Sequence, residues 1–583
     1  MRSGSRFKIG KHDWQIYVPI VQVLSQYKRT DFSHDLVAGL VVGMVTIPQA
    51  VAYAFLAGVP PQSGLYASLL PMVIYAIFGS SKQMVVGPVA VAALLVVATA
   101  SEYAPKYSDA YLGISIIICL QAGLFLWTLR LSRMGGLVNL LSHPVITGFV
   151  NAAAVLIIIS QLPAFTGLAT SESQQPITAL TNLLADAQNI HALTLTFGFS
   201  ALVLLLGFPW LVRRIARTLR IPMRRNHALT RIGPMVIASI AVVVVSLTGI
   251  ESQLSTVGPI PSGLPSITIP NFDLELWLAL LPASAIIAVV SYVESYSIGT
   301  TLAVRQQHRV NSHQELIALG AANIGAALTG AYPVAGSFSR SSVNYYSGAR
   351  SQVSSLVCAV VVIFVLLFLT ELFTTLPNPV LAAIVMVSVV GLMDLKNGPK
   401  HWEMHREDTI TEYTTMILVL FMGVEIGLLS GVVLSIAFFI RTSSRPNITQ
   451  VGRLADTEHF RSIKRYDVET LPAVLSLRVD ENIYFANALQ IEDKFMKRSQ
   501  RRPGTRHLLM VCSSINMIDA TGMQMLHRLN ANLKRANITF HMCDVKGTLL
   551  PQLERAGLMS DLTGQHFISA DRAMRHFETH EDN

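Results

Sequence analysis

Two short stretches, Val86-Gly87-Pro88-Val89-Ala90 and Ala335-Gly336-Ser337-Phe338-Ser339-Arg340, decide how this chain folds. Each opens an apolar segment that is too short to cross a bilayer, which takes about 20 helical residues. A proline in the first turn, as in the earlier stretch, is typical of a helix start. We therefore expect two half-helices that begin near the middle of a membrane, one in each half of the chain. Such a pair predicts an inverted-repeat fold with a binding site where the half-helices meet, although Gly-containing helix contacts would give a similar pattern.

The composition around these stretches is that of a membrane protein. Of the 583 residues, 51% are hydrophobic and 14% are charged, and the mean hydropathy is +0.48, whereas a soluble globular chain has about 25% charged residues. These values exclude a disordered chain, a collagen and a disulfide-stapled secreted domain. Fourteen apolar segments predict a polytopic α-helical membrane protein, and their approximate bounds are 35–57, 63–79, 84–101, 110–130, 142–161, 191–213, 232–250, 276–300, 314–331, 337–349, 352–375, 379–394, 410–423 and 425–441.

The charge density changes abruptly near residue 445. Residues 1–445 carry 26 Lys or Arg and 19 Asp or Glu, whereas the 138 residues from 446 to 583 carry 18 and 16. The second density is that of a soluble domain. We therefore expect a cytoplasmic N-terminal segment (1–32), a transmembrane transport domain (33–445) and a cytoplasmic soluble domain (446–583).

The positions of the basic residues predict the topology. With the N-terminus inside, the connections after odd-numbered spans contain Lys106 and no other Lys or Arg. The connections after even-numbered spans are basic, and the largest cluster comprises Arg213, Arg214, Arg217, Arg220, Arg224, Arg225 and Arg231. This is the positive-inside pattern, and it accounts for the net charge of +9 without nucleic-acid binding. We expect a multi-pass protein of a cell inner membrane, with both termini cytoplasmic and no cleaved signal segment.

Two charged residues fall inside apolar segments, where charge is costly and usually functional. Arg340 lies one turn into the second half-helix, where its charge adds to that of the helix N-terminus. The hydroxyls of Ser337 and Ser339 supply further donors, so the two half-helices predict an anion site. Glu294 lies within the eighth span. It either pairs with Arg340 as a structural ion pair, whose disruption would cost roughly 3–5 kcal/mol, or carries a proton.

Other chemistry finds little support in the sequence. Four scattered cysteines, Cys119, Cys358, Cys512 and Cys543, have no metal-ligand spacing. No nucleophile–base pair and no G-x-x-x-x-G-K-[ST] loop is present. We therefore expect no enzyme activity, no cofactor and no coupling to ATP.

Several motifs in order resemble the SulP sulfate-permease family of anion transporters. They are Ile47-Pro48-Gln49-Ala50-Val51-Ala52-Tyr53-Ala54, Ala57-Gly58-Val59-Pro60-Pro61, Gly64-Leu65-Tyr66-Ala67-Ser68, Val86-Gly87-Pro88, Asn323-Ile324-Gly325 and Gly336-Ser337-Phe338-Ser339-Arg340-Ser341. The resemblance covers essentially the whole chain. It implies two inverted seven-span repeats that form a core and a gate domain, a homodimer, and a cytoplasmic STAS domain of α/β architecture.

The resemblance also implies the site residues. The anion would lie between the third and tenth half-helices, lined by Gln49, Tyr53, Val89, Ala90, Ser337, Phe338, Ser339 and Arg340. Glu294 would be the acidic coupling residue of the eighth span. Sodium-coupled bicarbonate carriers of the family have Asp where Glu294 stands and Thr where Ile298 stands. Ile offers no oxygen to a hard cation, so this departure favours a proton-linked or exchange mechanism.

The tail resembles a STAS domain in its strands and in one loop. Val474–Leu477, His507–Val511 and Thr539–Cys543 are predicted strands with helices between them. Asn516-Met517-Ile518-Asp519-Ala520-Thr521-Gly522 resembles the loop in which a phosphorylatable Ser follows the Asp. Ala520 occupies that position here, which leaves Thr521, one residue later, as a weak regulatory candidate. A simple helix cap by Asp519 explains the same residues.

These inferences predict a secondary active transporter of a small oxyanion, with sulfate favoured by the resemblance. Bicarbonate or a dicarboxylate is the alternative within the family. A nucleobase permease of the same architecture would be expected to have acidic residues in place of Arg340. A non-transporting membrane sensor would signal through the tail, where a cytoplasmic partner could bind. The expected partners are therefore the small inorganic or organic anion, the lipid bilayer and a second copy of the chain.

Overall fold

The computed structural model describes residues 18–132, 142–168, 181, 185–219, 228–270, 272–305, 307–394, 402–403 and 405–580. Most of the expected N-terminal segment lies outside these residues, as do Arg220, Arg224 and Arg225. The chain divides into two compact units, Met1–Ser435 and Ile436–Asn583. The division falls within the last apolar helix, which continues without a break to Ser443.

The fourteen predicted segments of the first unit all form helices. They are α3 (Arg29–Ala57), α4 with α5 (Pro61–Ala67 and Leu70–Phe78), α6 (Ala90–Ala100), α7 (Asp109–Leu131), α8 (His143–Thr166), α10 (Ala192–Thr218), α11 (Gly233–Thr248), α12 (Leu274–Arg305), α13 (Ser312–Leu328), α14 (Phe338–Tyr346), α15 (Val353–Phe368), α16 (Asn378–Val390), α18 (Arg406–Met422) and α19 (Val424–Ser443). A short helix, α2 (Pro19–Ser25), precedes them. Among the described helices, seven are long and apolar enough to cross a membrane by themselves. With 11 and 9 residues, α6 and α14 are too short to cross, which confirms the two half-helices.

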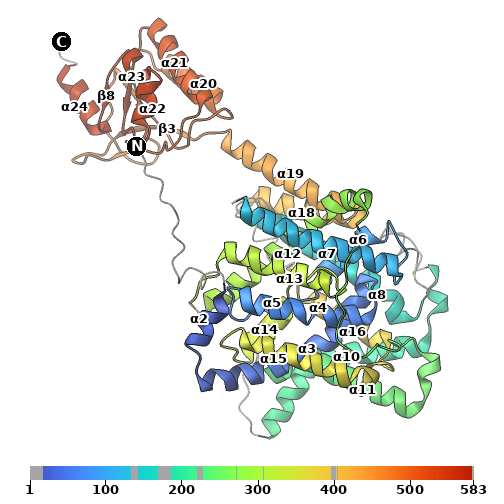
Figure 1. The fold of residues 1–583 in the computed structure, drawn as a ribbon. Helices are drawn as coiled ribbons and strands as arrows, with labels where there is room; N and C mark the ends of the chain where they lie inside the picture. The colour runs from blue at the N-terminus through green and yellow to red at the C-terminus, as the bar shows by residue number, and fades with distance from the viewer. Residues whose placement is uncertain are drawn as a thin grey trace. The chain divides into compact units, whose positions relative to one another are not determined.

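The helices of this unit pack as two bundles, and each bundle takes segments from both halves of the chain (Figure 1). In the first bundle, α3 packs on α15 and α14, while α13 packs on α5 and α7. In the second bundle, α8 packs on α16 and α18, and α10 packs on α16. The bundles meet where α3 contacts α16 and α11. This pairing of equivalent segments is the fourteen-span inverted repeat.

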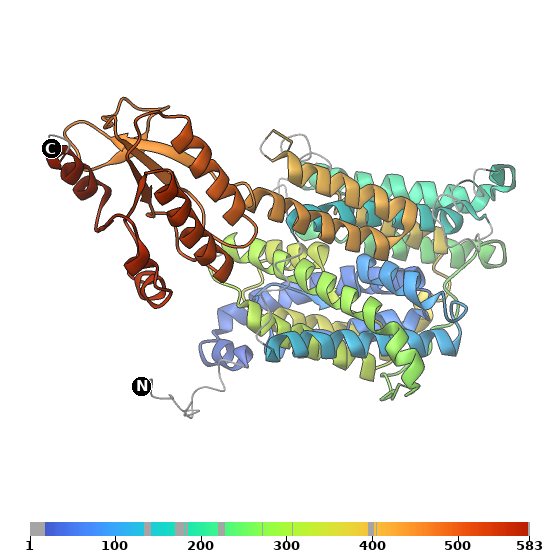
Figure 2. The ribbon, with the colours of Figure 1, turned by 90° about the horizontal axis from the view of Figure 1, so that it is seen from above.

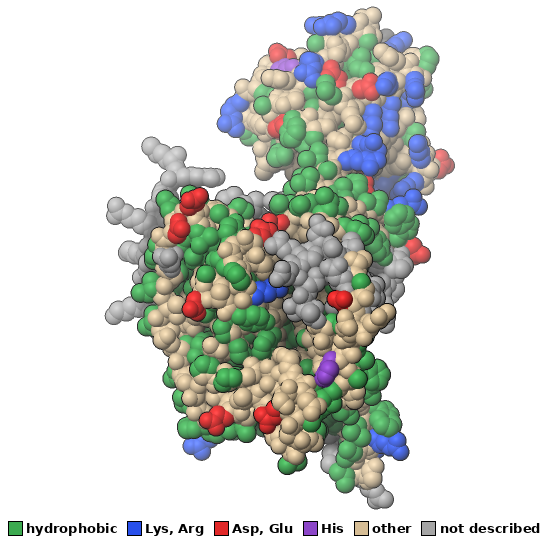
Figure 3. Space-filling model, turned by 90° about the vertical axis from the view of Figure 1, so that its right-hand side faces the viewer, with side chains coloured by type: hydrophobic (Ala, Val, Ile, Leu, Met, Phe, Trp, Pro, Cys, Tyr) green, Lys and Arg blue, Asp and Glu red, His purple; other side chains and the backbone are tan. Residues whose placement is uncertain are grey.

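Close helix contacts depend on small residues. A Cβ at Gly39 of α3 would lie 2.5 Å from the Ser354 carbonyl oxygen at the start of α15. Apolar side chains remain exposed on the outside of the unit, and Figure 3 shows many of them on the face that it draws. Leu206, Leu247 and Phe368 are examples of exposed apolar residues. In lipid, the hydrophobic effect does not drive helices together, so contacts at small residues provide the close packing that stabilises a bundle. The outer side chains are those expected to face a bilayer.

The second unit is an α/β layer built on a six-stranded sheet of order β4-β3-β5-β6-β7-β8 (Figure 2). Its strands are β3 (Ile448–Arg453), β4 (Phe460–Ser462), β5 (Val474–Val479), β6 (His507–Val511), β7 (Thr539–Cys543) and β8 (His566–Phe567). The strands β5 to β8 are parallel, and β3 is antiparallel to β4 and β5. The three predicted strands are therefore confirmed.

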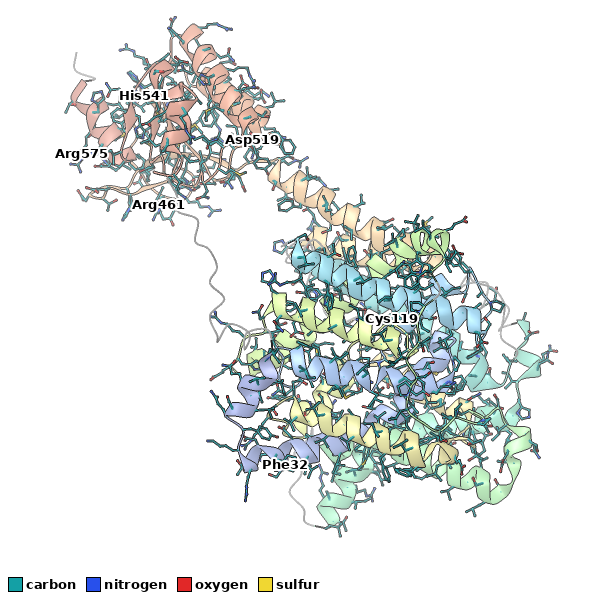
Figure 4. All side chains as sticks on the ribbon, in the orientation of Figure 1. Phe32, Cys119, Arg461, Asp519, His541 and Arg575 are labelled. Carbon is teal, nitrogen blue, oxygen red and sulfur yellow. The ribbon has the colours of Figure 1, made fainter. Side chains whose placement is uncertain are left out.

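Helices cover both faces of this sheet. They are α20 (Ala488–Gln500), α21 (Ala520–Arg535), α22 (Leu550–Arg555), α23 (Leu558–Asp561) and α24 (Ala570–His580). One buried core includes Phe495 of α20 and Leu529 of α21, and a second, smaller core includes Met574 and Phe577 of α24. Figure 4 shows Asp519 at the start of α21 and His541 within the sheet.

Candidate functional site

A two-stranded ribbon in the first unit brings the starts of the half-helices together. The strand β1 (Val86–Gly87) pairs antiparallel with β2 (Ala335–Gly336), and Val86 lies opposite Gly336. The Ser337 N–H donates to the Val85 carbonyl (3.0 Å), and the Gly336 N–H donates to the hydroxyl of Ser295 on α12 (2.7 Å). As a result, α6 and α14 begin side by side from opposite directions, in the middle of the bundle.

A buried asparagine fixes the approach to this ribbon. The Asn323 side chain accepts from the Val334 N–H (3.0 Å) and donates to the Val334 carbonyl (3.1 Å). Cys119 of α7, labelled in Figure 4, donates its thiol to the Asn323 carbonyl (3.1 Å). One amide thus satisfies both backbone groups just before β2, where no neighbouring strand does so.

Arg340 reaches from one half-helix to the start of the other. Its side chain is completely buried, and Nη2 donates to the Pro88 carbonyl at 2.6 Å. Neither Nε nor Nη1 has a hydrogen-bond partner among the described residues. A Cβ at Gly87 would lie 3.2 Å from Nη1, so Gly87 gives the guanidinium its room. The arginine therefore keeps a charge and two free donor atoms beside two helix N-termini, which suits an anion.

Tyr53, Tyr332 and Cys358 lie near Arg340, and all three side chains are uncharged at neutral pH. Among the described residues, no carboxylate forms an ion pair with it. A buried arginine without a counter-charge is costly. Within the described part of the chain, the charge of Arg340 is therefore not neutralised by a carboxylate.

Of the two residues predicted from the first span, Tyr53 lies near this arginine. Gln49 and Tyr53 are both buried, and Tyr53 also lies near Glu294 and forms a hydrogen bond with Ser388. The Gln49 amide donates to the hydroxyl of Ser388 on α16 (3.3 Å), while its Oε1 has no partner among the described residues. The Gln49–Ser388 contact joins the two bundles beside the candidate site.

The predicted residues of the half-helices comprise the two N-cap residues, Val89 and Ser337, and the residues that follow them. Val89 is the N-cap of α6 and has no capping side chain, so the first N–H groups from Ala90 onward remain available. Ser337 is the N-cap of α14, and its hydroxyl accepts from the Arg340 N–H (3.4 Å). Ser339 is half-buried and Phe338 is 41% exposed. Ser337 therefore caps the helix, and the side chain of Ser339 is the more accessible hydroxyl.

Glu294 stands apart from Arg340. It is half-buried on α12, and within the described part of the chain its carboxylate has neither a hydrogen-bond nor an ion-pair partner. No ion pair joins it to Arg340 in this part of the chain. Glu315 of α13 differs, because its carboxylate accepts from the Tyr75 hydroxyl (2.8 Å) and from the Ser80 N–H and hydroxyl (2.9 and 2.7 Å). Three hydrogen bonds therefore hold the Glu315 carboxylate in place, whereas none among the described residues holds that of Glu294.

Three residues at this site were not predicted from the sequence. Tyr332 is completely buried with an unpartnered hydroxyl, Cys358 lies near the Thr46 hydroxyl (3.7 Å), and Ser388 binds Gln49. Tyr332 precedes Pro333 near the predicted half-helix, which is a weak signal. Cys358 and Ser388 lie within long apolar runs, where no sequence signal marks them.

The predicted helix cap in the second unit is present. Asp519 is the N-cap of α21 and accepts from the Gly522 N–H (2.7 Å) and the Phe485 N–H (2.8 Å). Ala520 is exposed and Thr521 is half-buried. These two hydrogen bonds to backbone N–H groups account for an Asp at position 519.

Comparison with known proteins identifies the two parts of the chain. The Sulfate permease family matches residues 32–415, and the STAS domain matches residues 465–571. The probable sulfate transporter 4.2 of Arabidopsis thaliana is 35% identical over 553 residues, covering 92% of this chain and 79% of the relative. The high affinity sulfate transporter 2 of Stylosanthes hamata is 30% identical and covers 97% of this chain and 86% of the relative.

Solved structures share the fold. The murine Solute Carrier 26 family member A9 anion transporter, in an inward-facing state, superimposes with a TM-score of 0.89 at 22% identity, covering 99% of this chain and 96% of that one. The transmembrane domain of the cyanobacterial bicarbonate transporter BicA gives a TM-score of 0.58 at 21% identity, covering 70% and 98%. The chain therefore belongs to the sulfate permease family, whose members are transporters and not enzymes, and it carries a C-terminal STAS domain.

Proposed function

We propose that this protein is a secondary active transporter of small oxyanions, with sulfate as its favoured substrate. The observation that carries the proposal is Arg340, which is buried with two unpartnered donor atoms and no carboxylate beside it. An oxyanion bound there would neutralise the guanidinium and accept from the first N–H groups of α6. The related sulfate transporters support the choice of sulfate.

Transport would follow from relative movement of the two bundles. The half-helices and Arg340 belong to the bundle of α3 and α15, which would carry the anion as the core domain. The bundle of α8, α10 and α16 would form the gate domain. Because Gln49 and Ser388 bind across this boundary, their contact would break and re-form as the site opens to each side in turn.

Glu294 is the proposed coupling residue. A carboxylate without a fixed cationic partner can gain or lose a proton without breaking an ion pair. Its approach to Tyr53 and thereby to Arg340 would let the anion and the proton influence each other's binding. Ile298, one turn further along α12, is buried and has no oxygen for sodium, which favours proton-linked transport or exchange over sodium coupling.

Bicarbonate is the second candidate substrate, and Gln49 favours it. Gln49 Nε2 donates one hydrogen bond to Ser388, and Oε1, an acceptor, has no partner among the described residues. Bicarbonate carries an O–H group that can donate to this oxygen, whereas sulfate has none. A dicarboxylate is the third member of this class.

The remaining proposals concern the setting of the protein. We place it in a cell inner membrane as a homodimer, with both termini cytoplasmic and with a cytoplasmic partner for the STAS domain. The proposed domain limits are 1–32, 33–445 and 446–583. Among the described residues, the lower density of charge before residue 446 and the basic connections support this placement.

Uptake of labelled sulfate into proteoliposomes tests the transport proposal. We expect uptake by the wild-type protein, stimulation by an inward proton gradient, and competition by bicarbonate if the Gln49 argument holds. Vesicles with a folded Arg340→Ala variant serve as the control and should take up no sulfate. If sealed vesicles with correctly oriented wild-type protein accumulate none of the three anions, the protein is a non-transporting sensor.

A further inference from the structure

The start of the second unit carries an unneutralised group of basic side chains, which we call the basic edge: Arg441, Arg445, Lys494, Arg498 and Arg501. Arg441 lies in the last turn of α19, the final membrane helix, and Arg445 follows two residues after its end. The other three project from the end of α20 at a spacing of three to four residues, so they share one helical face. Figure 3 shows Lys and Arg side chains gathered on the face of this unit that carries α20 and α21.

Hydrogen bonds hold the α20 residues against the chain that leaves the membrane. Lys494 Nζ donates to the Pro446 carbonyl (2.7 Å), and Arg498 Nη2 donates to the Ile448 carbonyl (2.7 Å). These two carbonyls lie three and five residues after Ser443, where α19 ends. The basic side of α20 is thereby fixed within a few residues of the membrane-spanning helix.

The nearby carboxylates are already used elsewhere. Asp493 pairs with Lys497 (2.6 Å), Asp480 with Arg478 (2.5 Å) and Glu492 with Arg528 (3.2 Å). Within the described part of the chain, none of the five residues of the basic edge forms an ion pair with a carboxylate. Five positive charges therefore remain without a counter-charge at the point where the chain leaves the bilayer.

We propose that the basic edge binds the phosphate headgroups of anionic lipids in the leaflet beside it. Basic clusters directly after a membrane helix are attracted to anionic lipid surfaces, and each side chain strengthens binding about fivefold. The guanidinium groups of Arg441, Arg445 and Arg501 are exposed and suited to phosphate. The proposal does not depend on which anion is transported, so failure of sulfate uptake leaves it intact. It would tie the STAS domain to the lipid composition of the membrane.

Hydrogen exchange of the full-length protein in nanodiscs tests this proposal. We expect the segment from Pro446 to Arg501 to exchange more slowly in phosphatidylcholine with phosphatidylglycerol than in phosphatidylcholine alone, and high salt to reduce the difference. The variant Arg441→Gln/Arg445→Gln/Arg501→Gln should lose this difference, with an affinity for anionic lipid lower by about fivefold per residue. These three side chains make no hydrogen bond among the described contacts, so the variant should remain folded.

A matched variant, Arg461→Gln/Lys464→Gln/Arg465→Gln, removes the same charge from exposed positions on and after the edge strand β4, where Figure 4 shows Arg461. It should keep the wild-type protection. If both variants lost the lipid-dependent protection equally, the effect would come from the net charge in general, and this result would overturn the proposal. The proposal would also be overturned if the wild-type protein were protected equally in both lipid compositions. It would likewise be overturned if inorganic phosphate restored the protection in phosphatidylcholine alone, because that result would indicate a site for soluble anions.

Discussion

At the scale of single residues, substitutions of Arg340 test whether the proposed anion site binds sulfate. Replacing this arginine with Ala removes the buried charge and both free donors, so we expect sulfate binding to fall at least tenfold. The fold should survive, since among the described residues the Arg340 side chain loses one hydrogen bond, to the Pro88 carbonyl. Arg340→Lys keeps the charge but not the planar donors, and should bind with intermediate affinity. Equilibrium binding of labelled sulfate to purified protein measures this effect. Wild-type affinity in Arg340→Ala would remove Arg340 from the site.

Glu294 gives a second prediction at this scale, with Glu315 as its control. Glu294→Gln keeps the shape of a side chain that has no polar partner among the described residues, so we expect sulfate affinity to persist while stimulation by a proton gradient disappears. Glu315→Gln instead disturbs three hydrogen bonds and should destabilise the protein by about 1–3 kcal/mol. Uptake at imposed gradients and thermal unfolding separate the two. Unchanged gradient dependence in Glu294→Gln would make this residue structural.

At the scale of elements, the ribbon of β1 and β2 sets the geometry of the site without contributing a charged group. A Cβ at Gly336 would lie 2.6 Å from the Met84 sulfur and 3.2 Å from the Ser295 Cα. Gly336→Ala should therefore displace the start of α14 and weaken sulfate binding about tenfold, although no polar group is removed. Gly113→Ala on α7, where no atom lies within 4 Å, should bind normally. Equal binding by the two variants would contradict this role for the ribbon.

The sheet of the STAS domain contains a histidine that must stay neutral. His541 Nδ1 accepts from the Gln565 N–H (3.0 Å), so its Nε2 carries the proton and donates to His507 Nδ1 (3.2 Å). Burial, together with the charges of nearby His507 and His576, lowers the pKa of His541 from 6.5 to about 4. Below about pH 6.5 the unfolded chain takes up a proton that the folded domain does not.

We therefore expect the STAS domain to lose stability as the pH falls from about 6.5 to about 4, by up to about 1.4 kcal/mol per pH unit. His541→Gln can still accept and donate but does not titrate, so it should flatten this dependence. Hydrogen exchange across β8 and α24 in the full-length protein measures it. His459→Gln, at an exposed position just before β4, should behave as wild type; a flattened profile in that variant would point to another group.

The limits of the sequence are clearest for these elements. Pro88 and the Gly336-Ser337 pair mark helix starts by local chemistry, so the half-helices were predictable. The resemblance supplied their meeting point and the residues Gln49 and Tyr53. Ser388 lies in the run Val387-Ser388-Val389-Val390, where nothing local distinguishes it, and only the packing of α16 on α3 brings it to Gln49. The sequence also left open an ion pair between Glu294 and Arg340, because spacing along the chain says little about distance across a bundle.

At the scale of the whole molecule, the arrangement of the transmembrane unit divides the site between two bundles. Arg340, Tyr53, Tyr332 and both half-helices belong to one bundle, and Ser388 belongs to the other. The hydrogen bond between Gln49 and Ser388 is thus a place where the proposed anion site meets the bundle that would move past it. Alternating access requires this boundary to slide, whereas contacts within a bundle can stay fixed.

Cross-linking distinguishes contacts between the two bundles from contacts within one bundle. In the double variant Gln49→Cys/Ser388→Cys, a short bifunctional methanethiosulfonate, which links two thiols through disulfide bonds, should join α3 to α16 and stop the transport that the unlinked variant shows. Reduction of the disulfides should restore that activity. Thr46→Cys provides the matched control, because Thr46 lies 3.7 Å from the native Cys358 on α15, within one bundle. That link should leave most of the transport activity, since α3 and α15 move together. Continued transport by protein shown to be fully linked between α3 and α16 would contradict rocking at this boundary and favour a movement confined to the half-helices.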